Sequence, residues 1–256
     1  EDTSTNGTKQ YAKPGEEMLC FEMPRWRFDL LHPVDLVEEL AIGHGYEDLG
    51  VDVPKAPMNA LPRPDDHLRR RIRTSMQGMG FMQVQSLTLS NDDDQFNRMR
   101  WKPFNAITRI TNPITQDHTM MRHFLLPGLL RLLSSNRHHD LPQSVYELGT
   151  VVRDHVNSDR LAFVTAERVG GFAAIRGRIQ AFLRDLGAEN IVIEALPDNE
   201  GPWLAGRAAR VLLNGEWVGC FGEIDPAISQ TFELLVPLNG AEFDVEALKS
   251  TITDPV

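Results

Sequence analysis

The stretch AARVLLNGEWVGCF, residues 208–221, carries the clearest structural signal in the chain. At its centre lies Asn214-Gly215, and an Asn-Gly pair supplies the two positive-φ residues that a two-residue hairpin turn requires. The sequence therefore predicts two antiparallel strands, over residues 208–213 and 216–221, joined by this turn.

The elements around this hairpin mix helices and strands without regular alternation. Residues 172–186 repeat apolar side chains at helical spacing and meet Gly187, which predicts an amphipathic helix with a C-terminal glycine. Unevenly spaced helices combined with hairpins favour an α+β fold with an antiparallel sheet over repeated βαβ units. Further helices are expected near 65–80 (Leu68, Ile72, Met76 and Met79 inward), from Pro127 (Leu129, Leu130 and Leu133 inward) and near 226–233, and further strands over 81–89, 106–111, 143–152 and 241–245.

The amino-terminal part of the sequence has a different character. Asn-Gly and Pro-Gly pairs predict a loop or hairpin tip over residues 1–15, and an extended segment follows over residues 16–28. A helix is expected from Pro33 to Ala41, ahead of a glycine-containing break. Four prolines within residues 50–64 predict a linker and a domain boundary.

Composition limits the classes of protein that this chain can represent. The chain has 256 residues and a formal net charge of −10, so a broad basic face that grips nucleic acid is not expected. No apolar run approaches the roughly 20 residues of a membrane-spanning helix. Cys20 and Cys220 lie far apart without CxxC spacing, which argues against a disulfide scaffold and a cysteine zinc site. A reducing cytoplasm fits this composition best.

Asp29, Asp35, Glu38 and Glu39 form the most informative cluster of charged residues. On a helix that begins at Pro33, steps of about 100° per residue place the last three on one face, and Asp29 can approach them from the preceding segment. Four carboxylates supply the hard oxygen donors that magnesium or calcium accepts. The alternative is a solvated acidic face near the positive end of the helix dipole, and spacing alone favours this alternative.

Other charged residues are expected to have structural or solvated roles. Acidic residues precede the first arginines at helical spacing, and the second basic patch lies at a helix end, where cations suit the dipole. Phosphate-loop, GxGxxG, HExxH and GxSxG motifs are absent, so the sequence predicts no catalytic and no cofactor-binding residue. The basic residues for which a structural or solvated role is expected are Arg69, Arg70, Arg71, Arg73, Arg131, Arg137, His138, His139, His118 and His123.

Several strings taken together resemble the β-subunit family of phenylalanyl-tRNA synthetases. They occur in the family's order between about Glu16 and Leu248, and they are most similar to the C-terminal portion of the archaeal and eukaryotic branch. The strings are PRWRFD (24–29), HPVDLVEE (32–39), GY (45–46), NPIT (112–115), MR (121–122), LLPGLL (125–130), NR (136–137), YELG (146–149), GRA (206–208) and GCFGEIDP (219–226).

The resemblance implies a fold and a division into two modules. Residues 1–60 would be the C-terminal part of a small winged-helix-like, metal-binding module, and residues 61–256 a catalytic-like module with a class II aminoacyl-tRNA synthetase antiparallel sheet. A working class II site needs two arginines that hold ATP. The corresponding strands read VYEL (145–148) and GAEFDVE (240–246) and contain no arginine, so the isolated chain is expected to be inactive.

The resemblance also implies partners and a cofactor. An α subunit would bind phenylalanine and ATP and join phenylalanine to tRNA(Phe) within an α2β2 assembly in the cytoplasm. The family's magnesium site, shared with the α subunit, falls on Asp29, Asp35, Glu38 and Glu39, so the resemblance favours metal over a solvated acidic face. Two alternatives stay open, namely a metal-free assembly scaffold and a self-sufficient amino-acid-activating ligase.

Overall fold

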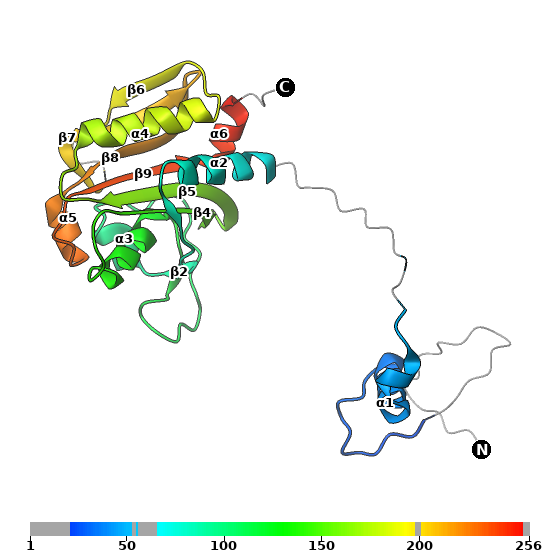
Figure 1. Ribbon diagram of the computed structural model, residues 1–256. Helices are drawn as coiled ribbons and strands as arrows, with labels where there is room; N and C mark the ends of the chain where they lie inside the picture. Colours follow the sequence, from blue (N-terminus) through cyan, green and yellow to red (C-terminus); the bar gives the residue numbers. More distant parts are fainter. Residues whose placement is uncertain (1–20, 53–54, 56–65, 198–200, 253–256) are drawn as a thin grey trace. The chain divides into compact units, whose positions relative to one another are not determined.

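The computed structural model describes residues 21–52, 55, 66–197 and 201–252 (Figure 1). The chain divides into two compact units, Glu1–Leu61 and Pro62–Val256. The predicted loop over residues 1–15, Cys20 and most of the predicted linker lie outside the described residues. None of the helices in the described ranges combines the length and the hydropathy needed to cross a lipid bilayer.

The smaller unit contains helix α1 (Pro33–His44) and the 3-10 helix η1 (Tyr46–Leu49). Helix α1 begins at the predicted proline but ends three residues later than expected, where Gly45 takes a φ of 103°. The predicted extended segment is wrong in its described part, because the Arg27 N–H donates to the Pro24 carbonyl oxygen at 2.9 Å and closes a turn.

A seven-stranded sheet forms the centre of the larger unit, in the order β1-β4-β5-β9-β8-β7-β6. Neighbouring strands are antiparallel except β1 and β4, which are parallel. The predicted α+β fold with a large, mostly antiparallel sheet is therefore confirmed. The strands are β1 (Met82–Gln83), β4 (Gln143–Arg153), β5 (Val156–Ala166), β6 (Ile191–Ala195), β7 (Trp203–Leu213), β8 (Glu216–Ile224) and β9 (Leu238–Asp244), and β2 (Leu89–Ser90) pairs with β3 (Met120–Met121) in a second, two-stranded sheet.

The predicted hairpin is present as β7 and β8. Asn214 and Gly215 have φ angles of 51° and 85°, and Leu213 pairs with Glu216 across the turn. Both strands extend beyond the predicted ranges, since β7 starts at Trp203 and β8 ends at Ile224. Positive φ at both turn positions costs little here, because asparagine tolerates the left-handed region and glycine has no Cβ.

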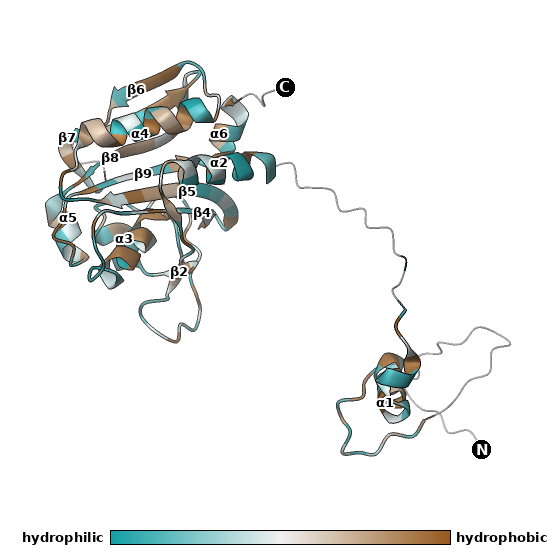
Figure 2. Ribbon diagram, in the orientation of Figure 1, coloured by the Kyte–Doolittle hydropathy of each residue, from teal (hydrophilic) through white to brown (hydrophobic). Residues whose placement is uncertain are grey.

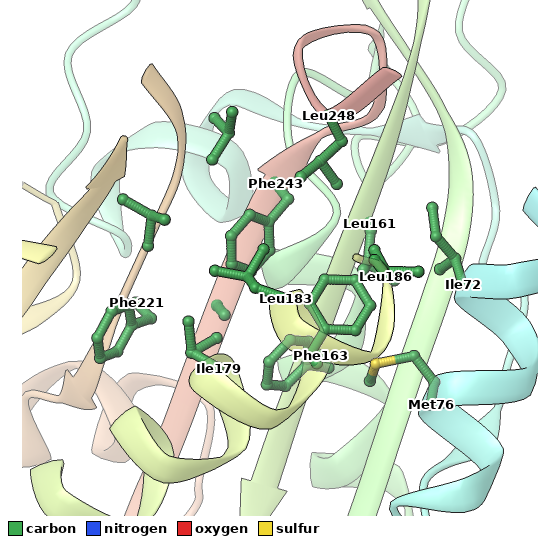
Figure 3. Close-up of a cluster of buried hydrophobic side chains, with 14 of the residues drawn as sticks. Ile72, Met76, Leu161, Phe163, Ile179, Leu183, Leu186, Phe221, Phe243 and Leu248 are labelled. Atoms are coloured by element: carbon green, nitrogen blue, oxygen red, sulfur yellow. The ribbon is translucent and has the colours of Figure 1, made fainter. Parts of the chain in front are cut away.

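Helices α2 (Asp66–Gly78), α4 (Phe172–Asp185) and α6 (Val245–Thr251) cover one face of the large sheet (Figure 1). Apolar and polar bands alternate along α4 in Figure 2, as its predicted amphipathic pattern requires. Side chains from α2 and α4 pack against Phe163 and Phe243 of the sheet (Figure 3). The inward residues predicted for α2 are confirmed, because Leu68, Ile72 and Met76 are buried and Met79 packs against the same core.

Helices α3 (Leu126–Ser135) and α5 (Pro226–Thr231) lie on the opposite face (Figure 1). Leu129, Leu130 and Leu133 of α3 are buried there, as predicted. A π-helix, η2 (Asp93–Asn97), belongs to the irregular region between β2 and β3. Both faces of the sheet are therefore covered by the chain's own elements.

Two predicted strands are largely wrong. Residues 81–89 pair with the large sheet only at Met82–Gln83 and enter the small sheet at Leu89, because the chain crosses from one sheet to the other in between. Residues 106–111 contribute a single bridge, Arg109 with Met120, because β3 offers only two residues for pairing. Strands β5 and β6 and helix α6 were not predicted from the sequence.

Candidate functional site

Asp29 and Glu39 of the predicted metal cluster meet at one cation, the guanidinium of Arg27. Arg27 Nε donates to Asp29 Oδ1 at 3.0 Å and Nη2 donates to Asp29 Oδ2 at 2.8 Å. The same Nη2 also donates to Glu39 Oε1. Hydrogen bonds from Arg27 lower the pKa of Asp29, so this carboxylate is held as an anion beside the guanidinium.

Asp35 has a different role, at the start of helix α1. Its Oδ2 accepts backbone N–H groups of Leu31 and His32, both at 2.7 Å, which satisfies donors that a helix N-terminus leaves without an intrahelical partner. These two bonds lower the pKa of Asp35. This carboxylate therefore anchors the entry to the helix, three residues before the exposed Glu38.

The structure thus brings two of the four predicted carboxylates together and places the other two on the same short helix. Carboxylate oxygens suit magnesium, but Arg27 occupies the point where Asp29 and Glu39 converge. Within the described ranges, no three His, Cys, Asp or Glu side chains are grouped as a metal site. The metal site stays a prediction. Binding of the ion would require Asp29 and Glu39 to break their ion pairs with Arg27.

A buried ion pair lies on the α3 face of the large sheet, in the larger unit. Arg122 Nη1 approaches Glu147 Oε1 at 2.6 Å, and the side chains are 5% and 1% exposed. Ser86 Oγ donates to Glu147 Oε2 at 2.6 Å, and Arg122 Nε donates to the Thr150 carbonyl oxygen at 2.8 Å. Because each charge has several polar partners, the pair can persist without water.

Glu242, on β9, is a second buried carboxylate on this face. Its Oε2 accepts the N–H groups of Leu125 and Leu126, both at 3.1 Å, at the start of α3. Burial raises the pKa of Glu242 to about 7, and the positive charges of Arg160 and Arg122 only partly oppose this shift. Arg153 Nη2 lies 3.9 Å from Glu242 Oε1.

These contacts close the α3 face of the sheet around Glu147 and Glu242. Both carboxylates are buried there and bind groups of the chain itself. Sequence reasoning identified both stretches only by their missing arginines and overlooked the carboxylates. A usable signal was present, since each glutamate interrupts an apolar strand in the strings VYEL and GAEFD.

Residues expected to have structural roles mostly do. Arg69 binds Asp159 of β5, and Arg71 donates to the Leu186 carbonyl oxygen. Burial lowers the pKa of His123, whose Nε2 lies 2.8 Å from the Phe104 carbonyl oxygen. Of the remaining basic residues, Arg131 binds Asp94 and Asp117, Arg137 binds Glu233, and the rings of His138 and His139 lie 4.2 Å apart.

Comparison with known proteins gives consistent matches along the chain. A model of the phenylalanyl tRNA synthetase beta chain CLM domain matches residues 50–245, and a model of the tRNA synthetase B5 domain matches residues 7–46. The phenylalanine–tRNA ligase beta subunit of Methanothrix thermoacetophila is 35% identical over 87% of this chain and 41% of the relative. Those of Archaeoglobus fulgidus and Methanosarcina barkeri are 34% and 33% identical, over 92% and 91% of this chain and 43% and 42% of the relatives.

The chain spans about two fifths of the length of these curated relatives. The first domain model covers well over half of the chain, and it includes the buried glutamates and α3. The chain therefore belongs to the phenylalanyl-tRNA synthetase beta chain family.

Proposed function

We propose that this chain is the beta-subunit part of a phenylalanine–tRNA ligase and supports the ATP-dependent attachment of phenylalanine to tRNA(Phe) by an alpha subunit. The observation that carries the proposal is its similarity, over about nine tenths of its length, to proteins named phenylalanine–tRNA ligase beta subunits. The assembly is α2β2 and acts in the cytoplasm. In this arrangement the chain supplies structure and the alpha subunit supplies the reacting site.

The closed sheet face supports a non-catalytic role for the larger unit. We assign this unit to a class II aminoacyl-tRNA synthetase-like module, and the smaller unit to part of a winged-helix-like module. An ATP site of the class II kind needs cations over the sheet, but β4 and β9 place Glu147 and Glu242 there. Glu147 binds the chain's own Arg122, and Glu242 accepts backbone amides, so each position presents a buried carboxylate in place of an ATP-binding cation.

Reconstitution tests the function directly. The alpha subunit of the same organism is assayed for aminoacylation of tRNA(Phe) alone and with this chain. We expect activity only in the mixture, and co-purification of the two chains. Failure of the two chains to associate, or full activity of the alpha subunit alone, would contradict the proposal.

A self-sufficient ligase is the alternative that the closed face disfavours. Such an enzyme would catalyse phenylalanine-dependent exchange of pyrophosphate into ATP without a partner. We expect the isolated chain to show no exchange above the background measured without phenylalanine. Exchange by the isolated chain would show that a nucleotide binds despite the contacts of Glu147 and Glu242.

A magnesium ion held by Asp29, Asp35, Glu38 and Glu39, beside the alpha subunit, forms part of the proposal. Its support is the donor chemistry and the convergence of Asp29 and Glu39 on Arg27. Because Arg27 competes with the ion, Arg27→Gln should tighten magnesium binding, and Glu39→Gln should weaken it. Titration with MgCl2, followed by the NMR shifts of residues 29–39, measures both effects. Absence of any response at millimolar ion would favour the metal-free scaffold.

A further inference from the structure

One loop of the larger unit presents an apolar side chain entirely to solvent. Residues 111–117 are all exposed, and Ile114 is 101% exposed. Among the described residues of this unit, Ile114 is the most exposed large apolar side chain, ahead of Val169 at 89% and Leu235 at 86%. Figure 1 shows a long loop near β2 that extends away from the large sheet. The 111–117 segment belongs to the irregular region between η2 and β3.

The base of the loop is fixed, although its tip is exposed. Arg109 makes a bidentate ion pair with Asp92, at 2.7 and 2.8 Å. The Ile110 N–H donates to the Thr119 carbonyl oxygen at 2.9 Å, and the Thr119 N–H donates to the Ser90 carbonyl oxygen at 2.8 Å. A tip held on such a base loses little conformational entropy when it binds, which favours recognition.

We propose that residues 111–117 form a docking loop that inserts Ile114 into an apolar pocket of the alpha subunit. This inference rests on the proposed function, in which the chain works only within an assembly. The curated relatives are named beta subunits, so a second kind of chain in their assembly is part of their description.

The chemistry of the tip favours a protein over nucleic acid. Residues 111–116 read TNPITQ and contain no charged side chain, whereas phosphate binding depends on lysine and arginine. Transfer of an isoleucine side chain from water into an apolar pocket tightens a complex by about tenfold or more. An exposed Ile114 between neutral residues is therefore suited to a methyl-lined protein surface and gains nothing from a phosphate backbone.

A cavity beside the loop offers a complementary feature. Its volume is about 440 Å³, and its walls include Asp117 and His118 from the loop, Leu87 and Leu89, and Leu132 of α3. Leu87 is 68% exposed at this site. A protruding apolar side chain and an adjacent hollow can engage one partner surface at two points, which raises specificity.

The test replaces Ile114 and measures binding to the alpha subunit. Ile114→Asp is compared with wild type and with Val169→Asp, a matched control on a different exposed loop. We expect Ile114→Asp to weaken the affinity for the alpha subunit by about tenfold or more, and Val169→Asp to leave it unchanged. Both positions are exposed, so the melting temperatures of both variants should match wild type. Isothermal titration calorimetry or surface plasmon resonance gives the dissociation constants.

The outcomes separate this inference from the proposed function. If wild type binds the alpha subunit and Ile114→Asp binds equally well, the docking role of the loop is wrong and the proposed function stands. If Ile114→Asp keeps its alpha-subunit affinity but the assembly loses affinity for tRNA(Phe), the loop contacts nucleic acid and the inference is overturned. If wild type does not bind the alpha subunit at all, the proposed function fails and the inference fails with it.

Discussion

Two oppositely charged side chains, Arg122 and Glu147, are buried together on the α3 face of the sheet. Their side chains are almost completely shielded from solvent. Removing either one would leave the other as an unpaired buried charge, which strongly destabilises the fold. Ser86 and the Thr150 carbonyl oxygen complete their hydrogen bonding. The pair therefore tolerates removal of both charges better than removal of either one.

This asymmetry gives a prediction for Arg122. Arg122→Met should lower the free energy of unfolding by about 3–5 kcal/mol, because it leaves the Glu147 carboxylate buried without its cation. The double variant Arg122→Met/Glu147→Leu should recover most of that loss. Urea unfolding at pH 7 measures the free energy of all three proteins. A double variant no more stable than the single one would contradict the prediction.

Glu242 predicts a dependence of stability on pH. Its pKa is raised from 4.5 to about 7 in the folded chain, so the folded state binds more protons than the unfolded state between these values. The stabilising contribution of protonated Glu242 to the free energy of unfolding is fully present below about pH 4.5. It is lost as the pH rises through about 7, and the loss is on the order of 3 kcal/mol.

Glu242→Gln is the variant that tests this linkage, because glutamine keeps an oxygen for the Leu125 and Leu126 N–H groups and does not titrate. Relative to Glu242→Gln, wild type should become less stable as the pH rises from 5 to 8. Chemical unfolding of both proteins at several pH values gives the difference. A difference that does not change with pH would show that Glu242 stays ionised throughout.

The contacts of the candidate site residues could not be predicted from the sequence. Asp29, Asp35, Glu38 and Glu39 were selected by spacing, but spacing contains no information about Arg27, which lies before the helix. The buried charges of the sheet face depend on partners distant in sequence, since Glu242 binds Leu125 and Leu126. Such long-range pairing is invisible to local periodicity.

At the scale of elements, close strand packing depends on glycine. Gly219 on β8 leaves no room for a Cβ, which would lie 2.6 Å from the Glu242 carbonyl oxygen and 2.5 Å from Phe243 Cδ1. The obstacle includes backbone of the paired strand β9, so a rotamer change of Phe243 alone cannot relieve it.

Gly219→Ala should therefore lower the free energy of unfolding by about 1–3 kcal/mol. Gly177 in α4 is the matched control, because a Cβ there has no neighbour within 4 Å. Gly177→Ala should raise stability by about 0.5–1 kcal/mol, the usual gain for alanine inside a helix. Thermal unfolding of the two variants gives opposite shifts if the argument holds. Equal shifts would mean that β8 moves away from β9 without cost.

Elements with strong local signals were predicted well, and those defined by tertiary pairing were not. Helices α2, α3 and α4 and the β7–β8 hairpin carry periodicity, proline, glycine or a turn dipeptide. Strand β5 was overlooked because its residues 157–160 are polar and because it follows a turn at Asp154 and His155, two positive-φ positions without glycine. Its long pairings with β4 and β9 form it.

For the whole molecule, net charge governs interactions with nucleic acid. A chain of formal charge −10 repels a phosphate backbone unless cations are locally concentrated. Basic residues such as Arg69, Arg131 and Arg137 are engaged with carboxylates of the chain itself. These three arginines are therefore partly neutralised within the chain, which weakens their attraction for a phosphate backbone.

We expect the isolated chain to bind tRNA(Phe) with a dissociation constant weaker than about 10⁻⁵ M at physiological salt. Tight binding should appear only when the alpha subunit is added. Fluorescence anisotropy of labelled tRNA, with the chain alone and with both subunits, measures the two affinities. Submicromolar binding by the chain alone would show that a local basic surface outweighs its net charge.

The closed α3 face also constrains how this lineage can evolve. An open groove would require simultaneous change of Glu242, of the Arg122–Glu147 pair and of the segment that leads into α3. Replacing Arg122 or Glu147 alone with an apolar residue leaves a buried charge without its partner, and replacing Glu242 alone with an apolar residue leaves two buried amides without an acceptor; each change destabilises the fold. These contacts therefore link the substitutions that could open this face, so that concerted changes are needed where single ones would suffice in an exposed site.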